Sequence, residues 1–238
     1  MDIYGLIGKN LSHSSSPEFF QEKFRQLGIH ADYKLFEFDN IDDFPDFIKN
    51  NPDLKGVNVT IPFKRSLGQY MDQIDNPVQI TGSINTIKIE LIKDKPFLTG
   101  HNTDVIGFEK TLRPVIKGRK NLRAMILGTG GSANSVAYVL RKMGILFCFI
   151  SRNPSKLLHS RYNWIDKVDI DNNLLIINTT PVGMFPENEN SPNIPYDYIT
   201  DNHILYDLVY NPTDTLFLKK GREKGAHCIN GKEMLEIQ

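Results

Sequence analysis

A glycine-rich turn between an apolar run and a helical pattern constrains the fold of this chain more than any other feature. The turn is Gly128-Thr129-Gly130-Gly131-Ser132-Ala133, which follows Leu122–Leu127 and precedes a helical pattern that extends to Met143. In a G-x-G-x-x-G/A turn the first glycine permits a tight bend and the second lets backbone amides approach a pyrophosphate. The small third residue lets the helix pack on the strand. A purely structural strand-to-helix turn is the alternative, but the flanking strand and helix favour a Rossmann-type dinucleotide-binding unit.

The end of the next apolar run indicates which dinucleotide would bind. After Ile145–Ile150 come Ser151-Arg152-Asn153, with Lys156 nearby and Arg152 placed 24 residues after Gly128. An NAD enzyme carries a carboxylate near this position for the ribose 2′-hydroxyl, whereas a guanidinium pairs with a 2′-phosphate. The sequence therefore favours NADP over NAD, with a surface arginine at a strand end as the alternative.

Strand-like and helical patterns alternate in both halves of the chain. The first half predicts strands over Ile3–Ile7, Tyr33–Phe38 and Gly56–Thr60 and a hairpin of Ile84–Ile89 with Pro96–Leu98. It also predicts a helix over Asp42–Lys49 and another that begins at Ser16. The buried face of the helix from Ser16 carries Phe20, Phe24 and Leu27. The second half adds strands over Leu122–Leu127, Ile145–Ile150, Leu174–Asn178 and Ile204–Val209, and a helix over Thr215–Lys224. This pattern predicts an α/β fold with two domains. We expect residues 1–104 to form a domain with a mainly parallel sheet, residues 105–227 to form a doubly wound Rossmann-type domain, and residues 228–238 to pack back on the first domain.

Composition and charge limit the classes of partner. Lys+Arg and Asp+Glu are both 28, so the net charge is zero, which gives no electrostatic reason to expect nucleic acid or an anionic membrane. The two cysteines, Cys148 and Cys228, form neither a metal-binding motif nor a disulfide framework, and Cys148 is predicted to be buried. The N-terminus lacks the features of a signal peptide. We therefore expect a cytoplasmic protein, monomeric or homodimeric, that binds a small molecule and no metal.

Two segments place proton-handling side chains directly after apolar runs. They are Asn58-Val59-Thr60-Ile61-Pro62-Phe63-Lys64 and Gly100-His101-Asn102-Thr103-Asp104. A lysine after a strand is usually solvated, and Asn-Thr-Asp usually begins a helix. Upstream of a dinucleotide-binding unit, however, a lysine and an aspartate indicate hydride transfer coupled to proton transfer.

The chain resembles the shikimate dehydrogenase family over nearly its whole length. The residues that carry the resemblance are the two segments above, Gly128–Ala133, Ser151-Arg152-Asn153, Ser12-His13-Ser14-Ser15-Ser16-Pro17, Gly82-Ser83-Ile84-Asn85-Thr86, Asn178-Thr179-Thr180-Pro181-Val182-Gly183-Met184, Tyr206-Asp207-Leu208-Val209-Tyr210-Asn211-Pro212 and Gly231-Lys232-Glu233-Met234-Leu235 to Gln238. The resemblance implies reduction of 3-dehydroshikimate to shikimate with NADPH in aromatic amino-acid biosynthesis. It also implies that the first domain binds the substrate.

The resemblance assigns roles to individual residues. Lys64 and Asp104 match the catalytic pair. The residues implied to contact the substrate are Ser14, Ser16, Asn58, Thr60, Lys64, Asn85, Asp104, Tyr210 and Gln238. The residues implied to contact the cofactor are Gly128, Thr129, Gly130, Gly131, Ser132, Ala133, Ser151, Arg152, Asn153, Thr179, Thr180, Pro181, Val182, Gly183, Met184, Leu208 and Gly231.

Three alternatives stay open at this point. A neighbouring carboxylate favours the ammonium form of Lys64, whereas desolvation favours the neutral amine. A quinate/shikimate dehydrogenase with relaxed cofactor use is the nearest alternative enzyme, although Ser151-Arg152 without an acid argues against it. A non-catalytic nucleotide sensor could share the fold, but it would need neither the Lys64–Asp104 pair nor the two serines.

Overall fold

The computed structural model describes the whole chain except residues 13, 15 and 155–158. Three residues that the sequence singled out, His13, Ser15 and Lys156, therefore lie outside the described part. The chain divides into two compact units, Met1–Thr103 and Asp104–Gln238.

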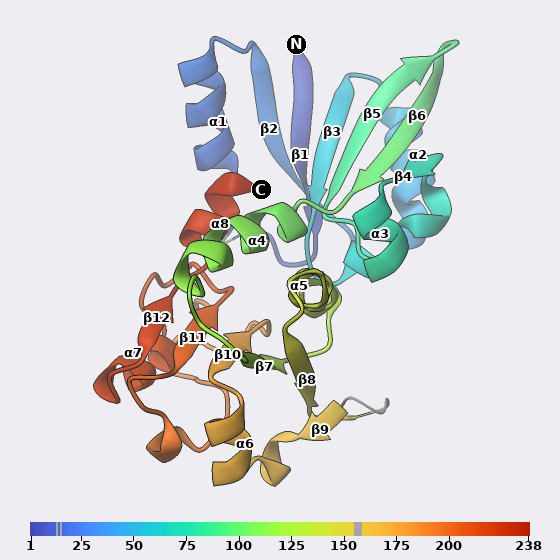
Figure 1. Cartoon of the computed structure of the whole chain (residues 1–238). Helices are drawn as coiled ribbons and strands as arrows, with labels where there is room; N and C mark the ends of the chain where they lie inside the picture. The colour runs from blue at the N-terminus through green and yellow to red at the C-terminus, as the bar shows by residue number, and fades with distance from the viewer. Residues whose placement is uncertain (13, 15, 155–158) are drawn as a thin grey trace. The chain divides into compact units, whose positions relative to one another are not determined.

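The first unit is built on a six-stranded sheet with the order β2-β1-β3-β5-β6-β4. Its elements are β1 (Asp2–Gly8), α1 (Ser16–Leu27), β2 (Ala31–Glu37), α2 (Phe44–Asn50), β3 (Leu54–Val59), β4 (Gln73–Ile74), α3 (Asn76–Thr81), β5 (Thr86–Ile92) and β6 (Lys95–His101). Strand β5 runs antiparallel to both of its neighbours, and the other pairs are parallel. The predicted α/β organisation is confirmed, and Figure 1 shows the strands fanning out between α1 and α2.

Alternate residues of the first sheet face two separate cores. Leu6 and Tyr33 pack with Phe20 and Phe24 of α1, while Ile7, Val57 and Val59 join the cluster that includes Phe44 and Ile48 of α2. This alternation follows from the two-residue period of a strand. The prediction that Leu27 shares the buried face of α1 is wrong, because its side chain is 63% exposed. Leu27 is the last residue of the helix, and helical spacing alone does not say how far the partner surface extends.

The second unit has the strand order of a doubly wound Rossmann sheet. Its elements are α4 (Asp104–Val115), β7 (Arg123–Leu127), α5 (Gly131–Lys142), β8 (Leu146–Ser151), β9 (His159–Arg161), α6 (Lys167–Asn172), β10 (Leu175–Asn178), β11 (Ile204–Asp207), α7 (Leu216–Glu223), β12 (His227–Ile229) and α8 (Lys232–Ile237). The order is β12-β11-β10-β7-β8-β9, and the neighbouring strands are parallel. The order reverses between β7 and β10, where folds of this class bind their ligands.

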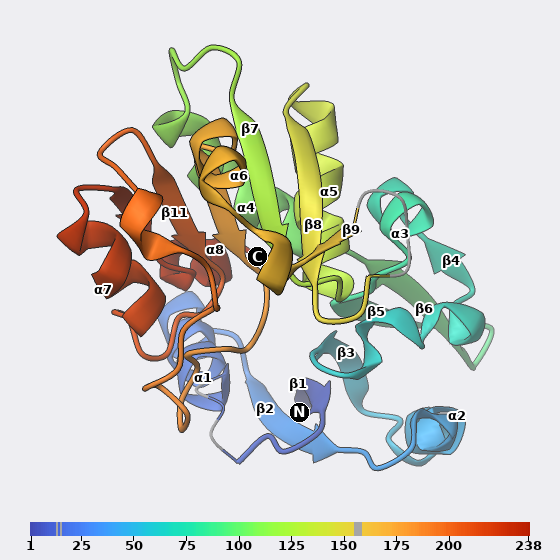
Figure 2. The same cartoon turned by 90° about the horizontal axis from the view of Figure 1, so that it is seen from below.

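Helices cover both faces of the second sheet, as a parallel sheet requires. Ile126 and Ile177 pack in a core that includes residues of α4, α5 and α8, and Met125 and Ile176 pack in a core that includes residues of α6 and α7. Figure 2 shows α5 lying alongside β7 and β8. Cys148 is half-buried rather than buried, and this partial burial raises the pKa of its thiol.

Residues 228–238 group with the second unit. Met234 of α8 is buried with Val105 and Phe108 of α4, and a Cβ on Gly107 would meet the Met234 carbonyl oxygen at 2.6 Å. That these residues also pack against the first unit stays a prediction.

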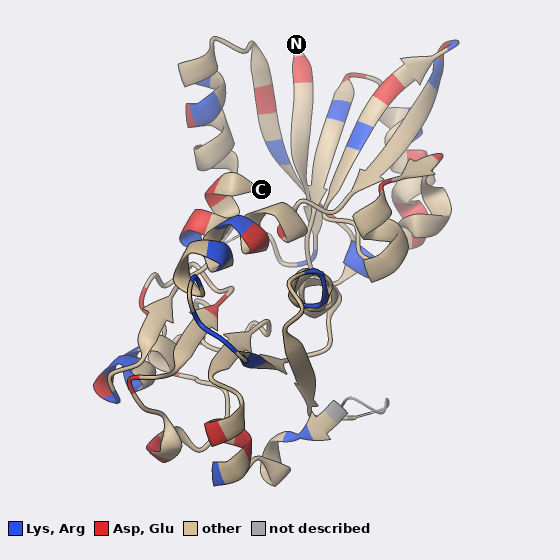
Figure 3. Ribbon diagram, in the orientation of Figure 1, with Lys and Arg blue, Asp and Glu red and all other residues tan. Residues whose placement is uncertain are grey.

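Basic and acidic side chains are interspersed along α1 and α4, in keeping with the zero net charge (Figure 3). Within the described residues, no helix combines the length and the apolar character that a membrane span needs.

Candidate active site

The topology of the first sheet brings its candidate substrate residues to one edge. Strand β3 ends at Val59, next to the end of β1, and the antiparallel strand β5 begins at Thr86, which pairs with Asn58. Thr86 also pairs with His101 at the end of β6. The segments that carry Thr60 and Lys64, Asn85, and Asn102 to Asp104 therefore all leave the sheet at the same edge.

Asn58 is held from both sides, by Thr86 on the adjacent strand β5 and by Tyr33 of β2, which lies beyond β1. The Tyr33 hydroxyl donates to Asn58 Oδ1 over 2.8 Å, and Asn58 Nδ2 donates to Thr86 Oγ1 over 3.2 Å. The sequence predicted Asn58 but missed Tyr33, whose only signal was its place in an alternating strand pattern. An amide with both ends fixed presents its remaining hydrogen-bonding positions in one orientation.

Asn85 is buried and tied to Thr103. Its Oδ1 accepts from the Thr103 backbone N–H over 2.8 Å, and its Nδ2 donates to Thr103 Oγ1 over 2.9 Å. Asn85 therefore fixes the residue that directly precedes Asp104.

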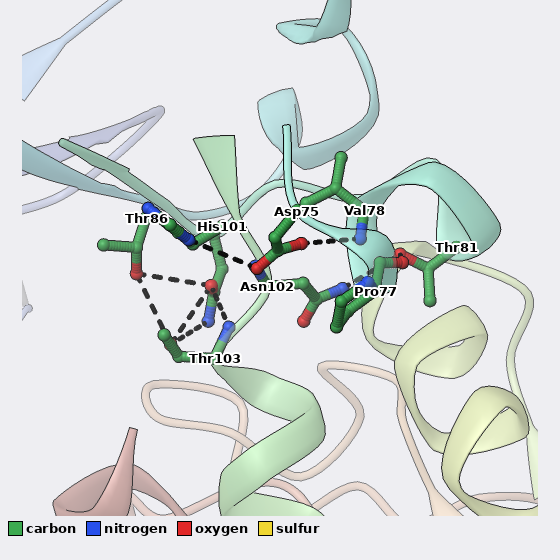
Figure 4. Close-up of polar contacts among 9 residues, drawn as sticks. Asp75, Pro77, Val78, Thr81, Thr86, His101, Asn102 and Thr103 are labelled. Atoms are coloured by element: carbon green, nitrogen blue, oxygen red, sulfur yellow. Dashed lines mark hydrogen bonds and ion pairs between the residues drawn. The ribbon is translucent and has the colours of Figure 1, made fainter. Parts of the chain in front are cut away.

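Asp75 fixes the same segment from its other side (Figure 4). Its carboxylate accepts from the Val78 N–H, which caps α3, and from the Asn102 N–H over 3.3 Å, and it contacts His101 Nδ1 at 3.2 Å. Asn102 Nδ2 in turn donates to Thr81 Oγ1 over 3.0 Å. Asp104 follows as the first residue of α4 and is 2% exposed. Asp75 was not predicted as a site residue, although Asp-Asn-Pro before a helix is a recognisable capping signal.

Lys64 lies in a short 3₁₀ turn, Phe63–Arg65, just after β3. Its carbonyl accepts from the Ile84 N–H over 2.7 Å, which ties this turn to the residue before Asn85. The Thr60 N–H donates to the Ile7 carbonyl. Thr60 also packs closely on Gly8, where a Cβ added to the glycine would lie 2.5 Å from Thr60 Cγ2. Local backbone geometry thus positions both Thr60 and Lys64.

Ser14 and Ser16 lie at the start of α1 and contact each other. The Ser14 hydroxyl is 3.1 Å from the Ser16 hydroxyl, and Ser14 Oγ accepts from the Ser16 N–H over 3.3 Å. Two adjacent hydroxyls at a helix N-terminus suit a carboxylate ligand.

The glycine turn of the second unit has the geometry that a pyrophosphate needs. Gly128 has a φ of +108°, and a Cβ there would lie 2.8 Å from Thr179 Oγ1 and from Thr180 Cγ2, so only glycine fits. Gly130 caps α5 with no side chain, and a Cβ there would meet nothing within 4 Å. Ala133 is fully buried where α5 packs on the sheet. This open space beside a helix N-terminus fits a dinucleotide phosphate.

The end of β8 presents a cation at the position predicted for the 2′-phosphate. Ser151 Oγ accepts from the Asn153 N–H over 3.2 Å and shapes the turn, while Arg152 is exposed. Burial raises the pKa of Tyr162 to about 12, and the charge of nearby Arg152 acts in the opposite direction. Arg152 is therefore accessible to a ligand.

The segment Asn178–Met184 follows β10 beside the glycine turn. The Thr179 N–H and hydroxyl both donate to the Leu127 carbonyl, over 3.0 and 2.7 Å. The Leu208 N–H donates to the Asn178 carbonyl, and the Gly231 N–H donates to the Val209 carbonyl. The structure thus brings the predicted cofactor residues Thr179, Leu208 and Gly231 to the carboxyl ends of β10 and β11.

Tyr210 and Gln238 belong to the second unit. Tyr210 is half-buried after β11, and Gln238 is exposed at the end of α8, where its N–H donates to the Met234 carbonyl. Their contribution to the substrate site stays a prediction.

Comparisons with known proteins cover both units. The family model of the shikimate dehydrogenase substrate-binding domain matches residues 6–87. A curated shikimate dehydrogenase (NADP(+)) from Clostridium botulinum is 40% identical, over 98% of this chain and 92% of its own. The solved shikimate dehydrogenase from Aquifex aeolicus is 32% identical, with a TM-score of 0.86 over 100% of this chain and 89% of its own. The Thermus thermophilus enzyme, solved in complex with NADP(H) and shikimate, is 27% identical, with a TM-score of 0.83 over 99% of this chain and 89% of its own.

Proposed function

Because this chain belongs to the shikimate dehydrogenase family, we propose that it interconverts 3-dehydroshikimate and shikimate, with Lys64 and Asp104 handling the proton of the reacting hydroxyl. It is an oxidoreductase whose cofactor is NADP. The observation that carries the proposal is the gathering of Asn58, Asn85 and the Lys64 turn at one edge of the first sheet.

Residues 1–104 would bind the substrate, a cyclohexene carboxylate with three hydroxyls. Asn58 and Asn85 are held by hydrogen bonds within the first unit, and amides can both donate to and accept from a polyol. The Ser14 and Ser16 hydroxyls would donate to the substrate carboxylate, and Thr60 would line the pocket.

Lys64 would supply the proton. During reduction its ammonium donates a proton to the ketone oxygen as that oxygen becomes a hydroxyl, and during oxidation the amine removes the same proton. Before the proton moves, the ammonium would stabilise negative charge on the oxygen. Asp104 would accept a hydrogen bond from the substrate hydroxyl and hold it against Lys64.

Residues 105–227 would hold the cofactor. NADPH supplies the hydride when it is bound. The first turn of α5 and Gly130 would contact the pyrophosphate, and Arg152 and Asn153 would contact the 2′-phosphate. The segment from Thr179 to Met184 would flank the nicotinamide and its ribose.

A turnover assay with matched substrates and cofactors tests the proposal. The absorbance of the reduced cofactor, NADPH or NADH, is followed with shikimate or quinate as the substrate and with NADP or NAD as the oxidant. We expect turnover with shikimate and NADP, and a marked loss when NAD replaces NADP. Lack of turnover at saturating shikimate would favour a nucleotide sensor, and equal rates with quinate and NAD would favour the relaxed enzyme.

A further inference from the structure

A buried carboxylate at the end of β11 lies beneath the segment that follows β10. The side chain of Asp207 is fully buried and accepts three hydrogen bonds. Its Oδ1 accepts from Asn178 Nδ2 over 2.9 Å and from the Val209 N–H over 3.1 Å, and its Oδ2 accepts from the Thr215 hydroxyl over 2.6 Å. Asp207 therefore joins the ends of β10 and β11 to the start of α7.

This carboxylate fixes the orientation of the Asn178 amide. An ionised carboxylate can only accept, so the Asn178 NH₂ group must face Asp207 and the Asn178 oxygen must face away. That oxygen accepts from the Thr180 N–H over 3.1 Å and from the Thr180 hydroxyl over 2.6 Å. The NH₂ group also donates to the Val182 carbonyl over 3.3 Å.

The hydrogen bonds thus continue from Asp207 through Asn178 into residues 180–182. The backbone of this segment is also held by the bonds of Thr179 to the Leu127 carbonyl and of the Met184 N–H to the Pro181 carbonyl, and the Val182 N–H donates to Thr180 Oγ1. Asn178 adds the side-chain contacts that tie both Thr180 and Val182 to the end of β10.

We propose that Asp207 is a positioning residue for the cofactor segment Asn178–Met184, acting through the Asn178 amide. The inference rests on the role of this segment in NADP binding given under the proposed function. In this role the buried Asp207 acts through Asn178 and not on the ligands themselves. It determines how far the cofactor segment is already in its binding conformation before NADP arrives.

The neighbouring residue Tyr206 provides a matched control. It lies on the same strand but faces the opposite side of the sheet, where its hydroxyl is 2.6 Å from Thr111 Oγ1. This pair is buried and polar like the Asp207 cluster, yet its contacts are with α4 and not with the cofactor segment. Tyr206→Phe removes one buried hydroxyl and leaves Thr111 its contacts with the Gly107 and Phe108 carbonyls.

The test compares the dissociation constants of NADPH and of shikimate, each measured by calorimetry on the full chain. Asp207→Ala should weaken NADPH binding about tenfold or more, since it frees the Asn178 amide. Asp207→Asn should stay within about threefold, because its oxygen can accept from Asn178 and Val209 while its NH₂ group donates to Thr215. Tyr206→Phe should stay within about twofold, and shikimate binding should be unchanged in all three variants.

Two results would overturn the proposal. One is an Asp207→Ala protein that binds NADPH as tightly as the wild type. The other is a variant in which NADPH and shikimate binding weaken together, which indicates a general loss of structure. If Asp207→Ala does not fold, Thr215→Val removes the donor to Oδ2 together with the cap that Thr215 Oγ1 gives the Leu218 N–H of α7. It should weaken NADPH binding about two- to fivefold and leave shikimate binding unchanged; unchanged NADPH affinity there would equally refute the role. A wild-type protein that binds NADPH but does not oxidise shikimate would refute the proposed function and leave this inference standing.

Discussion

The buried carboxylate of Asp207 makes a quantitative prediction about stability and pH. Burial raises the pKa of Asp207 from 3.8 to about 6, against the opposing effect of its hydrogen bonds from Thr215, Val209 and Asn178. Between these two values the folded state retains a proton that the unfolded state has already released. The free energy of unfolding therefore falls as the pH rises through this window. A difference of about 2 pKa units corresponds to about 3 kcal/mol.

Asp207→Asn isolates this contribution, because the variant cannot ionise at this position while other titrating groups are common to both proteins. Urea unfolding can be followed by the fluorescence of Trp164, the one tryptophan in the sequence, which lies in the same unit as Asp207. From pH 4 to pH 8 the wild type should lose about 2–3 kcal/mol relative to the variant, because part of the full contribution is already lost at pH 4. A difference that stays flat within about 0.5 kcal/mol, or that changes in the opposite direction, would refute the reasoning.

Four further predictions concern the proposed site. Lys64→Ala should lower kcat roughly 10²–10⁴-fold with little change in KM, the size expected for losing acid–base catalysis. Asp104→Asn should lower kcat and also raise KM for shikimate, because the carboxylate would hold the hydroxyl as well; steady-state kinetics separates the two effects. Arg152→Gln should lower kcat/KM for NADP by about tenfold or more and leave the value for NAD nearly unchanged, since a charge-assisted bond to the 2′-phosphate is lost. Gly130→Ala should weaken NADPH binding while costing about 1 kcal/mol or less of stability, because its added Cβ would enter open space.

Matched variants control for unspecific effects. Arg65→Ala changes an exposed cation in the same turn as Lys64 and should leave kcat unchanged. Near-normal turnover of Lys64→Ala would mean that Lys64 has no part in the mechanism. Arg161→Gln changes an exposed cation that contacts Trp164, in the strand beside Ser151, and should leave the ratio of NADP to NAD activity unchanged. A Gly130→Ala protein with wild-type NADPH affinity would mean that the cofactor does not approach this glycine. Asp104→Asn with unchanged KM would restrict Asp104 to the chemical step.

The parts of the fold that could be predicted from the sequence are those with strong local patterns. The buried strands of the second sheet read as continuous apolar runs, and the glycine turn identified the strand-to-helix junction at Gly128. Strands β9 and β12 escaped prediction because each has only three residues, too few for a period to be recognised. Helix α6 was missed although Asp166 and Asp169 form a capping box, because its six residues carry little apolar pattern.

The partners that hold the site could not be predicted, because they come from distant parts of the chain. Tyr33 of β2 reaches Asn58 of β3 across the intervening strand β1, and Asp75 meets Asn102 only after β4 and β6 pair. The burial of Asp207 depends on the packing of β10, β11 and α7 together. Motifs identify which side chains do chemistry, whereas tertiary packing decides which side chains hold them in place.

The central claim is that this protein transfers a hydride between NADP and the ring carbon that bears the reacting oxygen of shikimate. The most direct test reduces 3-dehydroshikimate with NADPH that carries deuterium at both C4 positions and analyses the product by NMR. The account predicts one deuterium on the carbon that was the ketone. Shikimate without deuterium at that carbon, or no reduced product, would contradict it.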